Sequence, residues 1–278
     1  MTTSGGFDPR RYWESRLQDR YSLAGVGHHR LGERFNGWQY RVKAHVFDAL
    51  VRSHVSNVRG AKVLEVGPGT GFYVSRWLVQ GASVTGLDIA DVAVEALGDR
   101  FPAARFLQGD IGLPLAEPLA SELGTFDIVC AMDVLYHVVD DALFETALHN
   151  LARLLKPGGH FVWSDVFLHG AEVRTTHAVS RTLASVERLL HGAGLRPVVR
   201  RPMAVLMNYP IDTRWRIVPL LWKAAMSPAV VSDFVGGVLG AALYLPERYL
   251  VTRLLEGPST EIMLCVNEPG PGRDRRAP

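Results

Sequence analysis

Short hydrophobic runs alternate with amphipathic stretches through the middle of the chain, from about residue 60 to 202. Apolar runs that stop at turn-forming or acidic residues predict buried strands. The predicted strands span 61–66, 83–87, 105–107, 126–131, 160–166 and 195–199. Helical spacing of apolar residues predicts helices over 72–80, 92–97, 141–155 and 180–190. Alternation of this kind predicts an α/β fold, with a mostly parallel sheet that carries helices on both faces.

The two ends of the chain and one late segment break this alternation. Residues 1–59 mix aromatic and basic side chains with a helical pattern that ends near Ser53, which predicts an N-terminal helical and aromatic lid on a core over 60–202. An apolar insertion over 203–257 precedes one more strand-like run within 258–267. The last residues, 268–278, are rich in Pro, Gly and Arg, so we expect a disordered tail.

Within the insertion, 224–245 is mostly apolar and has about the length of a membrane span, but Pro228 and Asp233 interrupt it. Its most apolar part, 234–245, is too short to cross a membrane. Three interpretations stay open: a span, contact with a membrane surface, or helices that form a lid or a homodimer contact through 203–257. Gly236 and Gly240 are spaced to allow close contact with another helix or another subunit.

Composition narrows the class of protein. The chain has 278 residues, of which 47% are hydrophobic, so it is long enough for one large core. Its net charge of +2 gives no electrostatic footprint for nucleic acid, and we expect no such partner. Its two cysteines, Cys130 and Cys265, lie in predicted strands and indicate buried thiols. The polar N-terminus lacks the apolar core of a signal peptide, so we expect a cytoplasmic protein.

A glycine-rich loop with Gly67, Gly69 and Gly71 follows the first predicted strand and precedes the first helix of the core. Glycine allows a tight turn and lets a ligand approach the backbone. A dinucleotide site has its last glycine five positions after the first, where this chain has Phe72. Glu65, just before the loop, would repel a pyrophosphate and suits a ligand with a positive charge.

Two more carboxylates follow the next two strands. Asp88 ends the second strand, where a carboxylate binds the ribose hydroxyls of an adenosine, and Asp110 follows the third. Because the carboxyl ends of parallel strands meet at one edge of a sheet, we expect Glu65, Asp88 and Asp110 to lie there together. Each alone is typical of a helix cap. In order and in register, they favour a nucleoside-like ligand.

Five segments of the chain resemble, in order, the motifs of class I S-adenosylmethionine-dependent methyltransferases. They are LEVGPGTG (64–71), GLDIA (86–90), QGDI (108–111), FDIVCAMDVLYHV (126–138) and LKPGG (155–159). The resemblance implies a Rossmann-like sheet of seven strands, in which an antiparallel seventh strand lies between the fifth and the sixth. That order separates the strands of Cys130 and Cys265 by a third strand, too far for a disulfide. It also implies S-adenosylmethionine as the cofactor.

The resemblance assigns cofactor contacts residue by residue. Glu65 and the loop glycines would cradle the methionine end of the cofactor, and Met132 and Asp133 would line the same side. Asp88 and the adjacent Ile89 would contact the ribose. Asp110 and Ile111 would contact the adenine. Two other functions stay open: an NAD-dependent oxidoreductase, and an S-adenosylmethionine-binding partner protein without catalysis.

Methyl transfer to a hydroxyl needs a base, and histidine is the usual one. His137, just after the fourth strand, is the first candidate; alternatively it only orients a helix or contacts the cofactor. His177 is the second candidate, and His28 or His29 could reach the site from the lid.

Asp133, Asp140 and Asp141 could join His137 around a divalent metal, since carboxylates with a histidine suit one. Acidic residues at helix starts are more often caps, so we expect no metal.

Aromatic residues of the lid and of the fourth strand's exit are the expected acceptor contacts. They are Tyr12, Tyr21 and Tyr136, with Trp13 beside them. The apolar insertion suggests an acceptor with a hydrophobic part. We therefore predict O-methylation of a small molecule of the sugar, lipid or polyketide type.

Overall fold

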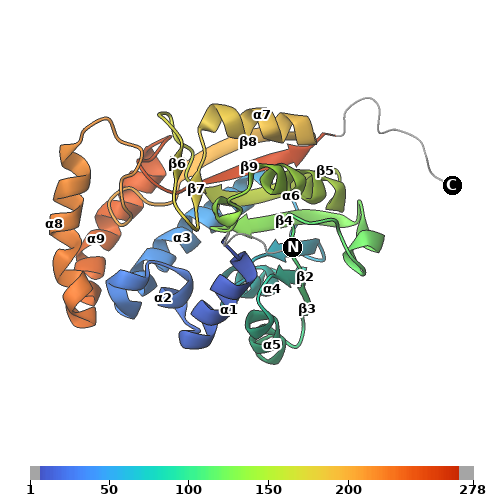
Figure 1. Ribbon diagram of the computed structural model, residues 1–278, viewed down its shortest axis with the longest axis horizontal. Coiled ribbons are helices and arrows are strands. Elements are labelled where there is room, and N and C mark those ends of the chain that lie inside the picture. The colour runs from blue at the N-terminus through green and yellow to red at the C-terminus, as the bar shows by residue number, and fades with distance from the viewer. Residues whose placement is uncertain (1–6, 269–278) are drawn as a thin grey trace, which may run out of the picture.

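A computed structural model describes residues 7–268 and shows a central sheet with helices on both faces (Figure 1). The strands of this sheet follow the order β3-β2-β1-β4-β5-β9-β8. Their bounds are β1 Lys62–Val66, β2 Ser83–Asp88, β3 Arg105–Gln108, β4 Phe126–Met132, β5 Leu155–Asp165, β8 Leu195–Pro202 and β9 Glu261–Asn267. Strand β9 runs antiparallel to both neighbours, and the other pairs are parallel. The predicted seven-stranded order is confirmed.

Strand β5 begins five residues earlier than its apolar run predicts. Leu155 already pairs with Phe126 of β4, and the register then shifts before His160 pairs with Ile128. Gly158 lies between these pairs with φ of +75°, which glycine adopts without strain. The Pro-Gly-Gly sequence therefore forms an irregularity inside the strand, which a hydrophobicity pattern does not reveal.

The helices of the core cover the two faces of the sheet. Their bounds are α3 Gly32–His54, α4 Phe72–Val79, α5 Asp91–Arg100, α6 Asp141–Leu154 and α7 Leu183–Ala193. On one face, Phe47 of α3 and Trp77 of α4 pack with ring centroids 4.9 Å apart. On the other face, Phe144 of α6 and Trp163 of β5 belong to a second buried cluster. The inner strands β1 and β4 are thus covered on both faces, as their continuous apolar runs require.

The N-terminal segment packs beside α5 rather than on the sheet. It comprises α1 Pro9–Asp19, α2 Leu23–Val26 and the 3-10 turn η1 His29–Leu31. Leu17 of α1 is buried against Ala93 and Leu97 of α5. The lid therefore lies on the side of the molecule where β2 and β3 form the end of the strand order (Figure 1).

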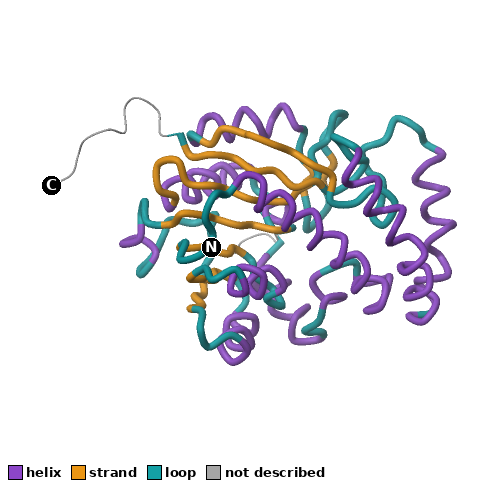
Figure 2. Tube along the Cα trace, turned by 180° about the vertical axis from the view of Figure 1, so that it is seen from behind, coloured by secondary structure: helices purple, strands orange, loops and turns teal. Residues whose placement is uncertain are grey.

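The insertion forms two long helices, α8 Ile217–Val231 and α9 Asp233–Arg253. Figure 2 shows both beyond the end of the sheet, away from the C-terminus. Helix α9 packs along α3, and a Cβ on Gly240 would lie 2.7 Å from the Trp38 ring. A Cβ on Gly236 would lie 3.0 Å from the backbone oxygen of Leu31. The glycine pair therefore serves a contact within the chain.

Four short elements lack a counterpart in the sequence prediction. They are η2 Leu119–Glu122, η3 Leu135–His137, and the hairpin of β6 Val173–Arg174 and β7 Val179–Ser180. Each is too short to show a hydrophobic period.

The thiols of Cys130 and Cys265 are buried and free, on strands separated by β5. No helix within residues 7–268 is both long and apolar enough to cross a membrane.

Glu247 of α9 holds the loop that enters the insertion. Its fully buried carboxylate accepts hydrogen bonds from the backbone N–H groups of Val205, Leu206 and Met207, at 2.7, 2.7 and 3.2 Å. Glu247→Ala leaves these donors without their acceptor and should lower the free energy of unfolding by at least about 3 kcal/mol. Urea denaturation measures this. The exposed Thr252→Ala on the same helix should change it by less than about 0.5 kcal/mol, and equal effects would contradict the role of Glu247.

Candidate functional site

The glycine-rich loop connects β1 to α4 with an unusual backbone. Gly67, Gly69 and Gly71 all have positive φ, of +62°, +55° and +79°. A Cβ on Gly67 would lie only 2.5 Å from the Val134 side chain, so no larger residue fits there. The loop therefore approaches the end of β4 closely and leaves bare backbone toward a cavity at the carboxyl edge of the sheet.

This cavity is lined by the ends of β1, β2 and β4 and by the lid. Loop residues Gly67 and Gly69 form its floor, and Trp13 of α1 and Tyr40 of α3 close it from the lid side. The predicted residues that line it are Gly67, Gly69, Asp88, Ile89, Asp110, Ile111, Met132, Asp133 and His137. The fold thus brings together residues that are far apart in the sequence.

Asp88 lies at the end of β2 beside the loop. Its carboxylate accepts hydrogen bonds from the N–H groups of Gly69, at 3.2 Å, and Ala90, at 3.0 Å. Burial raises the pKa of Asp88, while these backbone donors lower it. Since a carboxylate has about four acceptor positions, two backbone donors leave capacity for further hydroxyl groups.

Asp110 and Ile111 come after β3, as predicted, on the next stretch of cavity wall. One oxygen of Asp110 accepts the N–H of Gly112 at 2.8 Å and closes a tight turn. The backbone carbonyl of buried Ile111 accepts a hydrogen bond from Asn150 of α6 at 2.9 Å. This turn is therefore held from both sides.

Asp133 follows Met132 at the end of β4 and anchors α3 to the sheet. Its backbone has a φ of +59°, uncommon for a residue with a side chain. One carboxylate oxygen pairs with Lys43 of α3, and the other accepts from the Ser164 hydroxyl at 2.8 Å. Lys43 is almost fully buried; burial lowers its pKa, but the charge of Asp133 outweighs this, and the pKa of Lys43 is raised.

His137 lies in η3 with its ring held between the lid and a loop. Nδ1 is 2.7 Å from the carbonyl oxygen of His177, and because a carbonyl only accepts, Nδ1 carries the proton. Trp13 packs edge-on to the imidazole at 4.8 Å. Burial lowers the pKa of His137 to about 4, so the ring is neutral at physiological pH and Nε2 has a free lone pair.

Glu65, predicted beside the ligand, does not line the cavity. Successive side chains of a strand point to opposite faces, so Glu65 shares the α4 face with Val63. There it accepts a hydrogen bond from the indole of Trp77 at 2.9 Å. Burial raises the pKa of Glu65 to about 8, so this carboxyl is largely protonated near neutral pH. The charge argument for Glu65 therefore does not apply in the folded chain.

Several other predicted residues lie around the cavity without lining it. Gly71 is one of them, at the far end of the loop. Tyr21 donates to the carbonyl of Gly69 at 2.8 Å, and burial together with Asp88 raises the pKa of Tyr21 to about 12. Tyr12 stacks on the ring of His177 at 5.5 Å, and Tyr136 packs on His137 at 4.2 Å.

The remaining histidines and acidic residues have other neighbours. The ring of His28 faces Trp222 of α8 at 6.0 Å, and the side chain of His29 lies outside the described residues. Asp140 caps α6, while Asp141 pairs with Arg174 and Arg181. In the part of the chain that the structure describes, no three His, Cys, Asp or Glu side chains come together as metal ligands would. The predicted tail beyond Glu268 is likewise not described.

Three residues at the site, Tyr40, Lys43 and Tyr73, were not predicted from the sequence. Tyr73 of α4 lines the cavity, and its buried hydroxyl has no hydrogen-bond partner among residues 7–268. The sequence pattern could have indicated Lys43, because it lies at helical spacing between Tyr40 and Phe47 on the buried side of the helix. A lysine buried in this way needs an acidic partner.

Comparisons with known proteins agree on one family. Residues 64–163 match a family model described as a methyltransferase domain. A ubiquinone biosynthesis O-methyltransferase of Ruegeria pomeroyi is 33% identical over 181 residues, which cover 57% of this chain and 68% of that protein. One of Chromobacterium violaceum is 30% identical over 179 residues, or 52% and 73% of the two chains. The chain belongs to the S-adenosylmethionine-dependent methyltransferases.

The fold of this methyltransferase is shared with solved structures. A 1,6-didemethyltoxoflavin-N1-methyltransferase of Burkholderia thailandensis, crystallised with S-adenosylhomocysteine, superimposes with a TM-score of 0.54 at 17% identity. The match covers 96% of this chain and 94% of that one. The family also favours the methyltransferase over the NAD-dependent oxidoreductase considered above.

The described cavity residues fit the family's cofactor. Asp88 offers free acceptor positions for hydroxyl groups, the bare backbone of Gly67 and Gly69 admits a close ligand, and the Tyr73 hydroxyl is buried without a partner. An unsatisfied buried hydroxyl costs stability unless a ligand or water satisfies it. These features suit a ligand that presents both hydroxyl and polar groups to the cavity.

The buried pair of Lys43 and Asp133 should be worth more than its exposed counterparts. Lys43→Met leaves the carboxylate of Asp133 without its cation and should lower the free energy of unfolding by about 3 kcal/mol in urea denaturation. The double variant Lys43→Met/Asp133→Asn should recover part of this loss. Lys156→Met, which breaks the exposed pair with Asp127, should cost less than about 1 kcal/mol. Equal losses for both lysines would contradict the anchoring role.

Proposed function

We propose that this methyltransferase methylates a hydroxyl group on a small, uncharged acceptor with a hydrophobic part, and that His137 is the base. The observation that carries the proposal is the neutral imidazole of His137 at the cavity wall, with Nδ1 protonated by its bond to His177 and Nε2 free. The relatives' name, O-methyltransferase, supports oxygen as the atom methylated.

The lining of the cavity supports an uncharged acceptor. None of the described lining residues is Lys or Arg, so the wall offers no cation to a phosphate or carboxylate group. Apolar side chains such as Trp13, Leu17 and Leu143 form much of the remaining wall. A lipid- or polyketide-type hydroxyl fits this lining better than a sugar does, because a sugar needs several polar partners.

The proposed mechanism needs the protein mainly for position and for one proton. S-adenosylmethionine, when bound, supplies a methyl group on a sulfonium, and Asp88, Asp110 and Ile111 would hold its adenosine. A hydroxyl oxygen that takes up a methyl group becomes strongly acidic. A weakly basic imidazole therefore suffices to accept its proton, and Nε2 of His137 would hold that proton until solvent removes it. Trp13 and the His177 carbonyl keep the ring in place.

Asp88 should be required for cofactor affinity. Asp88→Ala removes the acceptor of the proposed ribose hydrogen bonds and should weaken S-adenosylhomocysteine binding about tenfold or more in calorimetry. The exposed Asp99→Ala on α5 is the matched control and should leave the affinity unchanged. If Asp88→Ala binds as tightly as the parent while remaining folded, Asp88 has no role in the ribose site.

His137 should be required for turnover rather than for binding. With a panel of lipid-like phenols, polyketide phenols, glycosides and their amine analogues, we expect S-adenosylhomocysteine formation from the apolar hydroxyl compounds. His137→Ala should lower kcat about 100-fold or more with little change in cofactor affinity. The exposed His191→Ala is the control. An unchanged kcat would remove His137 as the base, and preference for amines would overturn O-methylation.

The pH dependence gives an independent check of the same group. Because a base acts in its neutral form, and burial lowers the pKa of His137 to about 4, kcat/KM should stay constant from neutral pH into the mildly acidic range and fall only near that value. Circular dichroism at each pH separates this fall from acid unfolding. A fall centred on the ordinary histidine pKa would contradict the assignment.

A further inference from the structure

Helix α8 turns an apolar stripe toward solvent. The stripe consists of Ile217, Leu220, Leu221 and Val231, which are 55%, 60%, 60% and 88% exposed. Their spacing places them on one side of the helix, while Met226 and Ala229 are buried on the opposite side. The helix is therefore apolar on its buried face and on its exposed face alike.

Helix α9 repeats this arrangement. Its exposed apolar side chains are Phe234, Val238, Leu245 and Tyr249, at 66%, 57%, 70% and 63% exposure. They also share one side, away from Gly236 and Gly240, which pack on α3. We call these eight side chains of the paired helices the apolar face. Helices α8 and α9 pack on each other, and soluble monomers rarely leave so many large apolar side chains exposed on two neighbouring helices. The apolar face therefore indicates a partner.

The charges around the apolar face identify the chemistry of that partner. Between 213 and 255 the basic residues are Arg214, Arg216, Lys223, Arg248 and Arg253, and none forms an ion pair with another described residue. The only acidic residues there are Asp233, paired with Arg34, and Glu247, buried under its loop. The free charge beside the apolar face is therefore positive.

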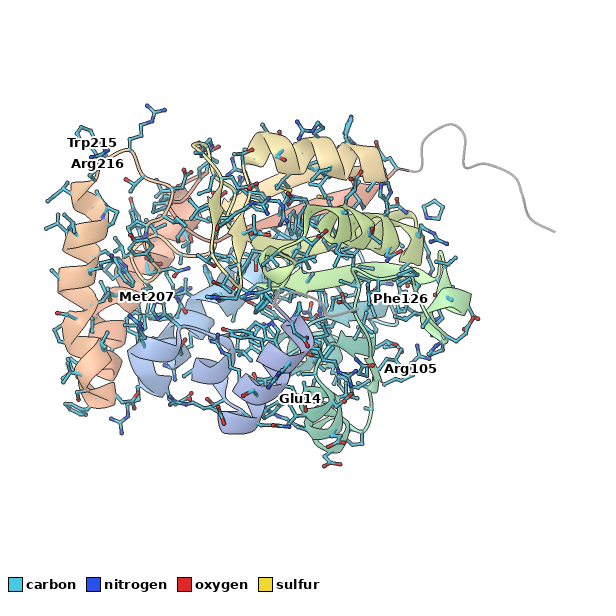
Figure 3. All side chains as sticks on the ribbon, in the orientation of Figure 1. Glu14, Arg105, Phe126, Met207, Trp215 and Arg216 are labelled. Carbon is cyan, nitrogen blue, oxygen red and sulfur yellow. The ribbon has the colours of Figure 1, made fainter. Side chains whose placement is uncertain are left out.

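Trp215 and two of these arginines directly precede the first residue of α8. Trp215 is 72% exposed between Arg214 and Arg216, and Figure 3 shows it at the outer edge of the molecule. Tryptophan with flanking cations is typical of segments at the level of lipid headgroups, where the ring meets the acyl boundary and the cations meet phosphates.

We propose that α8 and α9 dock on the surface of an anionic lipid bilayer, with the apolar face at the headgroup and acyl boundary and the cations on lipid phosphates. A second copy of the chain fits less well, because a twofold contact would set the same unpaired cations against each other. Neither helix is long and apolar enough for a span, so the contact is with the surface. This inference does not depend on the proposed acceptor.

Flotation with phospholipid vesicles tests the apolar face. The full chain should partition onto phosphatidylglycerol-containing vesicles at least about tenfold better than onto pure phosphatidylcholine. Leu220→Glu/Leu221→Glu should lose at least about tenfold of this binding. The control is Val79→Glu, since Val79 is 88% exposed on α4, away from these helices. Calorimetric binding of S-adenosylhomocysteine should be unchanged in both variants, which shows that they are folded.

The cations are tested separately. Arg214→Ala/Arg216→Ala should lower partition onto anionic vesicles about fivefold for each charge removed, and added salt should weaken binding of the parent. The control is Arg153→Ala/Arg188→Ala, which removes two exposed arginines from α6 and α7. Equal binding to neutral vesicles, or no effect of either set, overturns the proposal. A dimer in light scattering that Leu220→Glu/Leu221→Glu dissociates would instead assign the apolar face to a second copy.

Discussion

The pairing of β1 between β2 and β4 is the constraint on which the rest of this methyltransferase depends. Parallel pairing brings the carboxyl ends of these strands to one edge, so Val66 stands beside Leu87 and Ala131. The glycine-rich loop follows the end of β1, Asp88 is the last residue of β2, and Asp133 follows the end of β4. A shift by one residue in any pair would turn these side chains to the other face and dismantle the cavity.

Helix α3 is fixed to this edge of the sheet by a buried ion pair. Asp133, in its uncommon backbone conformation, accepts Lys43 from α3 and Ser164 from β5. Helix α9 packs against α3, and Gly236 and Gly240 allow the two helices to approach closely. Helix α3 therefore connects the sheet edge to the outer helices α8 and α9.

Much of the site was predictable because strand ends and glycine spacing are local features. Asp88, Asp110, Met132 and His137 line the cavity as their positions after strands suggested. Glu65 does not, because alternation along β1 turns it toward Trp77. The three tyrosines proposed as acceptor contacts do not line the cavity: Tyr12 stacks on His177, Tyr21 bonds to Gly69, and Tyr136 packs on His137. The direction in which such a ring points depends on what its segment packs against.

The sequence by itself determined the alternation of strands and helices, because hydrophobic periodicity encodes local structure directly. The resemblance of its motifs to a known family implied the seven-stranded order and the cofactor. Only the tertiary structure decided which groups meet. It paired Lys43 with Asp133 and gave Nδ1 of His137 its carbonyl partner, and among the described residues it left the hydroxyl of Tyr73 without a partner. It also packed Gly236 and Gly240 of α9 against α3 and left the apolar face exposed. These outcomes depend on packing between distant segments, which no local pattern specifies.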